Sequence, residues 1–88
     1  MSEARQTRLK RLKMRSMRRG IKEMDLILSR FADDCLSQMT ADALDTYEDF
    51  LEENDQDLYQ WVSGQRPSAP QFQALVEDIK AHISSTPR

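Results

Sequence analysis

The chain has 88 residues, of which 39% are hydrophobic and 32% are charged, and its net charge is −2. This length predicts one domain with a thin core, which disfavours deep pockets and two-domain clefts, while the apolar content is too high for a disordered chain. No apolar run approaches the ~18 residues of a membrane span, so we expect no membrane insertion, and a single cysteine leaves no internal disulfide.

Two helices are predicted in the first third of the chain. Residues 5–18 are rich in the helix formers Arg, Lys, Leu and Met, with Leu9 and Leu12 as the regular apolar positions. Gly20 then indicates a break or a tight junction. A second, strongly amphipathic helix follows. Its expected core positions are Ile21, Met24, Ile27, Leu28, Phe31 and Cys35.

Three shorter helices are predicted beyond residue 39. Thr40 is a candidate N-cap for the first of them, and the next begins near Asn54 or Asp55. Gly64 is a candidate C-cap, and the last helix opens near Pro70. Their expected core positions are Leu44, Tyr47, Phe50 and Leu51, then Leu58, Trp61 and Val62, then Phe72, Leu75, Val76, Ile79 and Ile83.

No segment alternates with the period of a strand, and no repeat is visible. We therefore predict an all-α fold, a small bundle of about five short helices forming a single domain over residues 1–88, with residues 1–4 and 84–88 loose. Trp61, the only tryptophan, is expected to anchor the core.

The charges are strongly segregated along the chain. Residues 1–30 carry ten Lys/Arg against three Asp/Glu, whereas residues 31–57 carry ten Asp/Glu and no Lys/Arg. Such a split indicates either a basic tail that seeks nucleic acid or a membrane surface, or two faces that neutralise each other in the fold. The acidic residues of the third helix are expected to form a solvated face, with a docking surface as the alternative.

The sequence offers no catalytic or metal-binding constellation. A metal site needs several ligands at short spacing, and one Cys and one His, 47 positions apart, do not supply it. Cys35 is expected to be a small core residue, and His82 a solvated residue near a helix C-terminus. Two glycines cannot build a phosphate-binding loop. We therefore predict no catalytic residue, no metal and no enzyme activity.

The basic N-terminal third has three interpretations: a nucleic-acid arm, a transit peptide, or a protein-binding face. If the second helix extends back through Gly20, then Arg19, Glu23, Leu26 and Arg30 share an exposed strip opposite the core. An arginine beside an apolar side chain and a glycine is typical of an interface centre. The alternative is an ordinary Arg19–Glu23 pair on the surface of a helix.

Gly20 admits two physical explanations. Either its backbone has a positive φ at a helix junction, or it has helical φ and a side chain would collide with a partner. We expect the second, because Arg19 and Glu23 must share a face to act together.

Two motifs carry a resemblance to a known family. "RRGIKEMD" at residues 18–25 and "NDQDLYQWV" at residues 54–62 resemble the SdhE family, the FAD assembly factors of succinate dehydrogenase, also called succinate dehydrogenase assembly factor two. The family pattern is Arg-Gly-x-x-Glu, followed about 30 residues later by an acidic Asp-Leu-aromatic-x-Trp segment. The resemblance covers about residues 8–83, with Gln56 standing where many members have proline.

The resemblance implies a binding partner and no substrate. Family members bind the flavoprotein subunit of succinate dehydrogenase, in bacteria also that of fumarate reductase, and promote covalent attachment of FAD to it. Carried over to this chain, Arg19, Gly20 and Glu23 face the partner, within a motif that includes Arg18 and Asp25. Leu26 joins this set through its place on the exposed strip.

The remaining expectations concern the state of the protein in the cell. FAD belongs to the partner, so we expect no tightly bound cofactor and a monomer when free. The location is the bacterial cytoplasm, or the mitochondrial matrix if the source is eukaryotic. The competing function is a small basic-helix module that binds nucleic acid or another protein.

Overall fold

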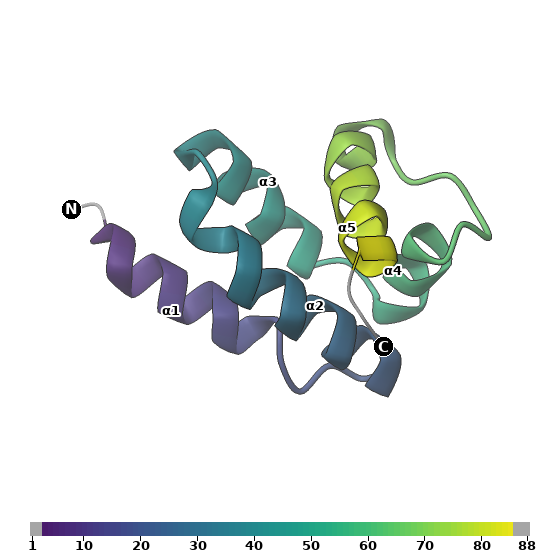
Figure 1. Cartoon of the computed structure of the whole chain (residues 1–88), viewed down its shortest axis with the longest axis horizontal. Helices are drawn as coiled ribbons and strands as arrows, with labels where there is room; N and C mark the ends of the chain where they lie inside the picture. The colour runs from purple at the N-terminus through teal and green to yellow at the C-terminus, as the bar shows by residue number, and fades with distance from the viewer. Residues whose placement is uncertain (1–2, 86–88) are drawn as a thin grey trace.

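The computed structural model describes residues 3–85, and none of these residues forms a strand. Within this range, five α-helices and two short 3₁₀ segments make up the fold (Figure 1). The all-α prediction is therefore confirmed. The elements are α1 (Arg5–Arg15), α2 (Lys22–Cys35), η1 (Leu36–Gln38), α3 (Ala41–Leu51), α4 (Asp55–Val62), η2 (Pro70–Phe72) and α5 (Gln73–Ser85).

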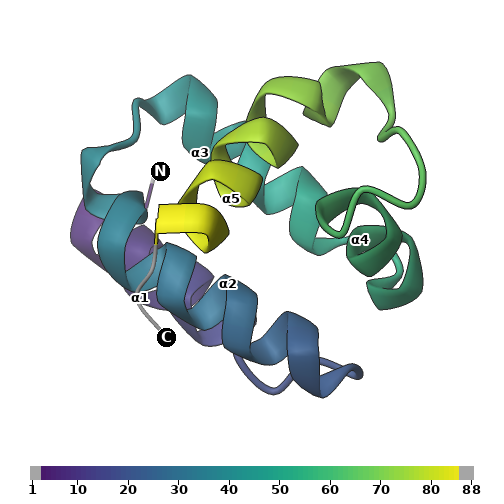
Figure 2. The ribbon, with the colours of Figure 1, turned by 45° about the vertical axis from the view of Figure 1, so that its right-hand side comes forward.

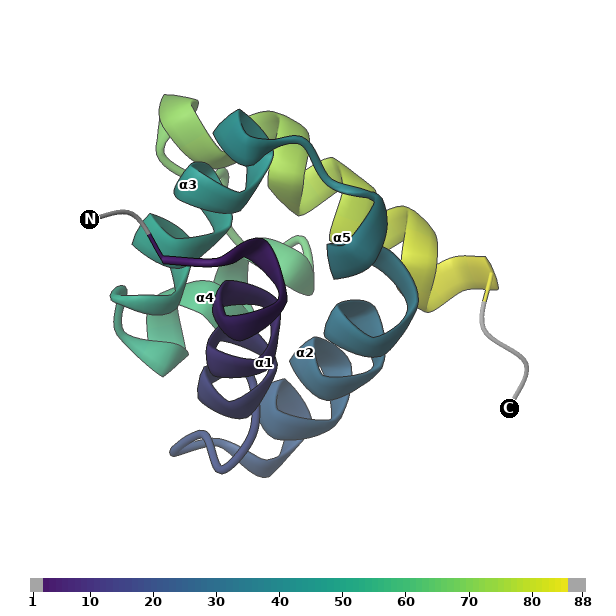
Figure 3. The ribbon, with the colours of Figure 1, turned by 90° about the vertical axis from the view of Figure 1, so that its left-hand side faces the viewer.

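The helices surround one hydrophobic core. α2 contacts α1, α4 and α5, and Figure 3 shows α1 and α2 lying side by side. The expected core stripe of α2 is present: Met24, Leu28 and Phe31 are buried, with Ile21, Ile27 and Cys35 packed at its edge. The predicted positions in α3, α4 and α5 are buried too, except Ile83, which is 40% exposed.

Trp61 anchors the core, as the sequence predicts. It is only 7% exposed, and its ring lies 6.2 Å from that of Phe50 and 5.9 Å from that of Phe72. This aromatic group joins α3, α4 and η2, and therefore fixes where α4 begins relative to the rest of the bundle.

The predicted helix signals act as expected in the second half of the chain. Thr40 Oγ1 accepts a hydrogen bond from the Ala43 N–H at 3.1 Å, and Asn54 Oδ1 accepts one from the Gln56 N–H at 2.8 Å. Gln56 thus supplies a donor that a proline there would lack. Gly64 has φ +84° just after α4, before the long connection to α5 that Figure 2 shows (residues 63–69).

Two predicted boundaries are wrong. The first helix ends at Arg15 and not at Arg18, because the chain leaves the helix after Ser16, whose side chain is buried. Residues 84 and 85, expected to be loose, belong to α5. The other positions expected to be loose are 1–2 and 86–88, which lie outside the described residues, and 3–4, which precede α1.

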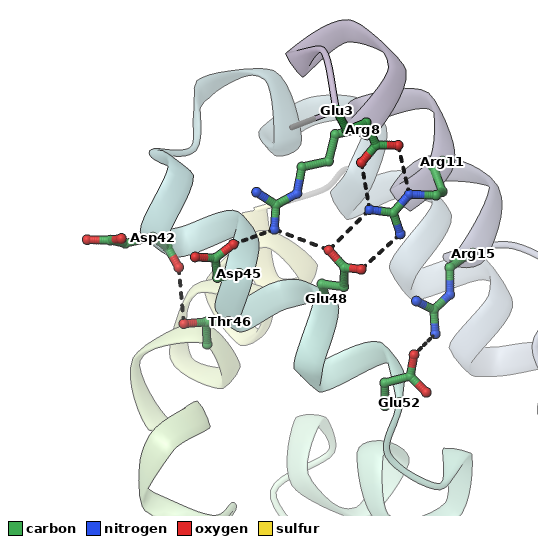
Figure 4. Close-up of polar contacts among 9 residues, drawn as sticks. All are labelled: Glu3, Arg8, Arg11, Arg15, Asp42, Asp45, Thr46, Glu48 and Glu52. Carbon is green, nitrogen blue, oxygen red and sulfur yellow. Dashed lines mark hydrogen bonds and ion pairs between the residues drawn. The ribbon is translucent and has the colours of Figure 1, made fainter. Parts of the chain in front are cut away.

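The segregated charges meet across the interface between α1 and α3 (Figure 4). Arg8 pairs with Asp45 and, at 3.1 Å, with Glu48. Arg11 Nη1 lies 2.9 Å from Glu48 Oε2. Arg15 pairs with Glu52. Of the two explanations for the charge split, the structure supports two faces that neutralise each other. The acidic residues of α3 remain largely exposed, as expected, and Glu48 alone among them is partly buried.

The carboxyl of Glu48 makes this interface sensitive to acid. The hydrogen bond from Arg11, above all, lowers the pKa of Glu48 below its ordinary value of 4.5. A folded-state pKa below the unfolded value means that the unfolded chain binds more protons, so the stabilisation is complete above about pH 4.5 and is lost as the pH falls through the folded pKa.

We therefore expect the wild type to lose up to about 1 kcal/mol more stability than Glu48→Gln between pH 6 and pH 3, a range set by the modest strength of partly exposed ion pairs. Urea unfolding at a series of pH values measures this difference. Glu77→Gln is the control, since Glu77 has only a 3.9 Å contact with Lys80 on its own helix. Parallel pH profiles for wild type and Glu48→Gln would contradict the assignment.

Candidate functional site

The first motif begins in the junction loop (residues 16–21) between α1 and α2. Ser16, at its start, is fully buried. Its Oγ donates to the Leu12 carbonyl at 2.8 Å and lies 2.6 Å from the Tyr47 hydroxyl. Burial raises the pKa of Tyr47 to about 12, so this hydroxyl stays neutral and available as a donor. The hydrogen bonds fix the end of α1 against α3.

Arg18 adopts a backbone conformation that residues other than glycine rarely take. Its φ is +55°, in the left-handed region, which costs a non-glycine residue about 1 kcal/mol or more. The Arg18 N–H donates to Asp25 Oδ2 at 2.9 Å, and the other oxygen of Asp25 accepts from Ser29 Oγ at 3.2 Å. Asp25 therefore holds the loop backbone from the first turn of α2.

Arg19 points into the molecule. Its Nε and Nη2 lie 2.9 and 2.7 Å from Asp55 Oδ1. Nη1 donates to the Arg15 carbonyl at 3.0 Å, and Nη2 donates to the Leu51 carbonyl at 3.1 Å. One guanidinium thus joins the C-terminal ends of α1 and α3 to the N-terminal end of α4. Its side chain is 12% exposed.

The expected exposed strip is therefore wrong in one member. α2 begins at Lys22, and Ile21 before it is extended (φ −115°, ψ 124°), so the helix does not reach back through Gly20. Arg19 therefore does not lie on the face of α2 that carries Glu23. The alternative, an ion pair between Arg19 and Glu23, does not form either, because Arg19 pairs with Asp55. The stronger acceptor for Arg19 is Asp55, 36 positions away.

Gly20 is held by the same carboxylate as Arg19. Its N–H donates to Asp55 Oδ2. A Cβ built on Gly20 would lie 3.1 Å from that oxygen. Gly20 lies in the loop between α1 and α2, and its φ is not positive: within residues 3–85 the positive φ values fall on Arg18 and Gly64. The positive-φ explanation is therefore excluded. Glycine is needed because a carboxylate approaches its backbone closely.

The other candidate residues face outward. Glu23 is exposed in the first turn of α2, where the helix dipole stabilises its negative charge. Leu26 is 52% exposed on the next turn. Arg18 is exposed as well, and its guanidinium has no hydrogen bond or ion pair with any of residues 3–85. The exposed candidate residues of the first motif are therefore Arg18, Gly20 and Glu23, and Leu26 adds an apolar side chain just past its end.

The second motif lies directly behind the first. Asp55 is in the first turn of α4, after the Asn54 cap, and is 17% exposed. Leu58, Trp61 and Val62 of the same helix are buried. The motif therefore has an apolar face that anchors α4 and one carboxylate that reaches the junction loop. Two short segments about 35 residues apart in sequence form one site.

Comparison with known proteins agrees with this pairing of motifs. Residues 10–83 match the model of the family described as the flavinator of succinate dehydrogenase. The chain belongs to this family. Relatives that carry the name succinate dehydrogenase assembly factor 2, mitochondrial, are 42% identical over 79 residues in Penicillium rubens, 35% over 82 in Drosophila grimshawi and 39% over 72 in Schizosaccharomyces pombe.

The matched region is only part of those proteins. It covers 84, 90 and 82% of this chain but 26, 56 and 52% of the respective relatives. The chain of this flavinator family member thus spans between about a quarter and just over half of their length. All the residues of the site described above lie within the matched region.

The environments expected for Cys35 and His82, a core position and a solvated one, are only partly confirmed. Cys35 is half-buried against the core, and burial raises the pKa of its thiol, as a structural cysteine requires. His82 is not solvated: its side chain is 13% exposed, its Nε2 lies 2.7 Å from Asp34 Oδ2, and its ring meets Phe31 edge-on at 5.7 Å. The error came from treating the last turn of α5 as free, whereas it packs on α2.

Two kinds of feature are absent from the described part of the chain. Among residues 3–85, no cluster of three or more His, Cys, Asp or Glu side chains could hold a metal ion. No helix in the same range is long and apolar enough to cross a membrane.

Sequence reasoning missed the residue that organises the site. The sequence marked Asp55 only as a helix start within the second motif, Ser16 only as part of the first helix, and Tyr47 only as a core position. The sequence did indicate that an arginine of the first motif could pair with an aspartate of the second. However, residues 31–57 contain ten acidic residues, and nothing in the sequence singles out Asp55 among them. Packing of α4 against the bundle makes the choice.

Proposed function

We propose that this protein is an assembly factor that binds the flavoprotein subunit of succinate dehydrogenase and promotes covalent attachment of FAD to that subunit. Fumarate reductase, whose flavoprotein subunit also carries FAD, is a second client. The observation that carries the proposal is the exposed part of the first motif on a loop that two carboxylates hold in place. Membership of the flavinator family supplies the reaction.

The proposed role is to position the client. The bond between flavin and protein forms between groups of the client and FAD, and the assembly factor holds the client in an arrangement where those groups meet. FAD stays with the client, the free protein is a monomer, and it acts without catalytic residues of its own. The compartment is the bacterial cytoplasm or, for a eukaryotic source, the mitochondrial matrix, which the names of the relatives favour.

A nucleic-acid-binding module is the weaker candidate. Phosphate binding requires cations that are available. Arg8, Arg11 and Arg15 already pair with carboxylates of α3, and Lys13 Nζ lies 2.8 Å from Asp33 Oδ1. The basic helix is therefore largely neutralised within the domain.

Glu23 provides the test of the proposed surface. Glu23→Ala is expected to slow covalent flavinylation of the purified client at least about tenfold, the effect of losing an interface residue worth ~1.4 kcal/mol. Its stability should stay within about 0.5 kcal/mol of the wild type, because the side chain is exposed. Flavin fluorescence of the client in a denaturing gel measures the rate for each flavoprotein separately.

Glu77→Ala, an exposed glutamate on α5, is the matched control and should flavinylate normally. If Glu23→Ala matches the control, Glu23 lies outside the interface. If the wild type accelerates neither client, the proposed function is wrong. A calorimetric titration with FAD alone belongs in the same series, and submicromolar affinity would show a flavin carrier instead of a docking protein.

A further inference from the structure

We propose that Asp55 of the second motif is a positioning residue: it holds the junction loop in the conformation that turns Arg19 inward and presents Arg18 to the client. The inference rests on the proposed function and deepens it. It gives the two adjacent arginines of the first motif opposite roles, and it gives the second motif a part in client binding without contact with the client.

The first step concerns the carboxylate itself. Asp55 uses both oxygens on the junction loop: Oδ1 accepts from the Arg19 guanidinium and Oδ2 from the Gly20 N–H. The Asp55 carboxylate thus accepts one charge-assisted hydrogen bond from the Arg19 side chain and one from the Gly20 amide, and together they fix the backbone of these two residues. Since α4 is anchored by buried Leu58 and Trp61, the carboxylate is a fixed point of the bundle.

The second step concerns the loop, which does not hold its shape by its own hydrogen bonds. Arg18 has φ +55°, a conformation that persists only where the surroundings impose it. Asp25 holds the Arg18 N–H from one side, and Asp55 holds the Gly20 N–H from the other. The strained residue thus lies between two amides that carboxylates of different helices bind.

The third step follows from the directions of the two arginines. Arg19 is 12% exposed and its guanidinium meets Asp55 and two helix-terminal carbonyls. Arg18 is exposed and unpaired within residues 3–85. Locking Arg19 on Asp55 fixes the backbone that carries Arg18, and with it the direction of the exposed Arg18 side chain.

The experiment compares Asp55→Ala with a core variant of similar stability, Val76→Ala, which removes two methyl groups from α5 away from the loop. Client affinity is measured at a temperature where circular dichroism shows every variant fully folded. If releasing the loop leaves it in the competent conformation about a tenth of the time, the client Kd rises about tenfold in Asp55→Ala. Val76→Ala should bind as the wild type does.

Amide hydrogen exchange supplies a readout that needs no client. The Gly20 amide should exchange at least several-fold faster in Asp55→Ala and at the wild-type rate in Val76→Ala, because only the first variant removes its acceptor. Asp55→Asn keeps the volume and one carbonyl oxygen, so it should fall between the two. It also replaces Asp55→Ala should the alanine variant not fold.

Each outcome decides a different point. Wild-type client affinity in folded Asp55→Ala would overturn the inference. An equal loss of client affinity in Val76→Ala would overturn it too, because the loss would then follow from lower stability alone. If the wild type binds neither flavoprotein, the proposed function fails. Exchange at Gly20 then decides by itself whether Asp55 holds the loop.

Discussion

Arg19→Ala is expected to cost about 2 to 3 kcal/mol of stability, although arginines on helical proteins are usually replaced with little effect. The variant loses both carbonyl contacts and leaves the 17%-exposed Asp55 without its cation. Asp55 keeps the Gly20 N–H and the N-terminal end of α4, which limits the cost. In a domain of this size the melting temperature should fall by about 10 to 20 °C.

The neighbouring arginine is the matched control for this prediction. Arg18→Ala removes an exposed guanidinium without a partner in residues 3–85, so its stability should stay within about 0.5 kcal/mol of the wild type. Arg19→Lys should recover only part of the loss, because an ammonium cannot bind a carboxylate and two carbonyls in one plane. Equal melting temperatures for the two alanine variants would show that Arg19 is not an internal residue in solution.

Gly20→Leu is expected to combine a stability loss of about 2 kcal/mol with loss of client binding. The Cβ would point at Asp55 Oδ2 from 3.1 Å, and the larger side chain must push that carboxylate off the Gly20 amide and away from Arg19. Gly20→Ala needs a shift of only a few tenths of an ångström and should cost about 1 kcal/mol.

Asparagine separates this explanation from a backbone one. Where a glycine serves a positive φ, Asn is tolerated better than Ala, whereas close approach of a carboxylate makes Asn no better. Melting temperatures and client affinities for the Ala, Asn and Leu variants at this position give the answer. A rescue by Asn, or an alanine variant as stable as the wild type, would contradict the assigned contact between Gly20 and Asp55.

The sequence predicted the helices well where local chemistry decides them. Thr40 and Asn54 cap the helices that follow them, and Gly64 takes the left-handed conformation after α4. The apolar spacing of α2 likewise identified Leu28 and Phe31 as core. These features depend on neighbours within one or two turns, so a single sequence contains them.

The site was predicted in part. The resemblance selected two segments that the structure brings together, and Glu23 and Leu26 are exposed as expected. The position of Arg19 was wrong because it depends on contacts with Leu51 and Asp55, more than 30 positions away. Helical spacing could not reveal that the helix stops short of Gly20, since an arginine and a glycine fit a helix and a junction equally well by pattern alone.

The attachment of α1 gives the domain an uneven distribution of stability. α1 has one fully buried side chain, Leu12, with Leu9 packed at the edge of the core. Ion pairs near the surface join α1 to α3, and one from Lys13 joins it to α2. Such pairs weaken as salt screens them, whereas the aromatic core around Phe50 does not depend on ions. We therefore expect α1 to open first, and at a lower free energy in concentrated salt.

Local opening of α1 would also reach the junction loop. The Arg15 carbonyl, which holds Arg19, belongs to the last turn of α1, and Ser16 fixes that turn to Tyr47. Fraying of α1 breaks both of these contacts, whereas the hydrogen bonds that Asp55 accepts from the loop remain. Ionic strength thus acts on the presentation of Arg18 from a distance, through a helix that itself contributes no residue to the exposed surface of the motif.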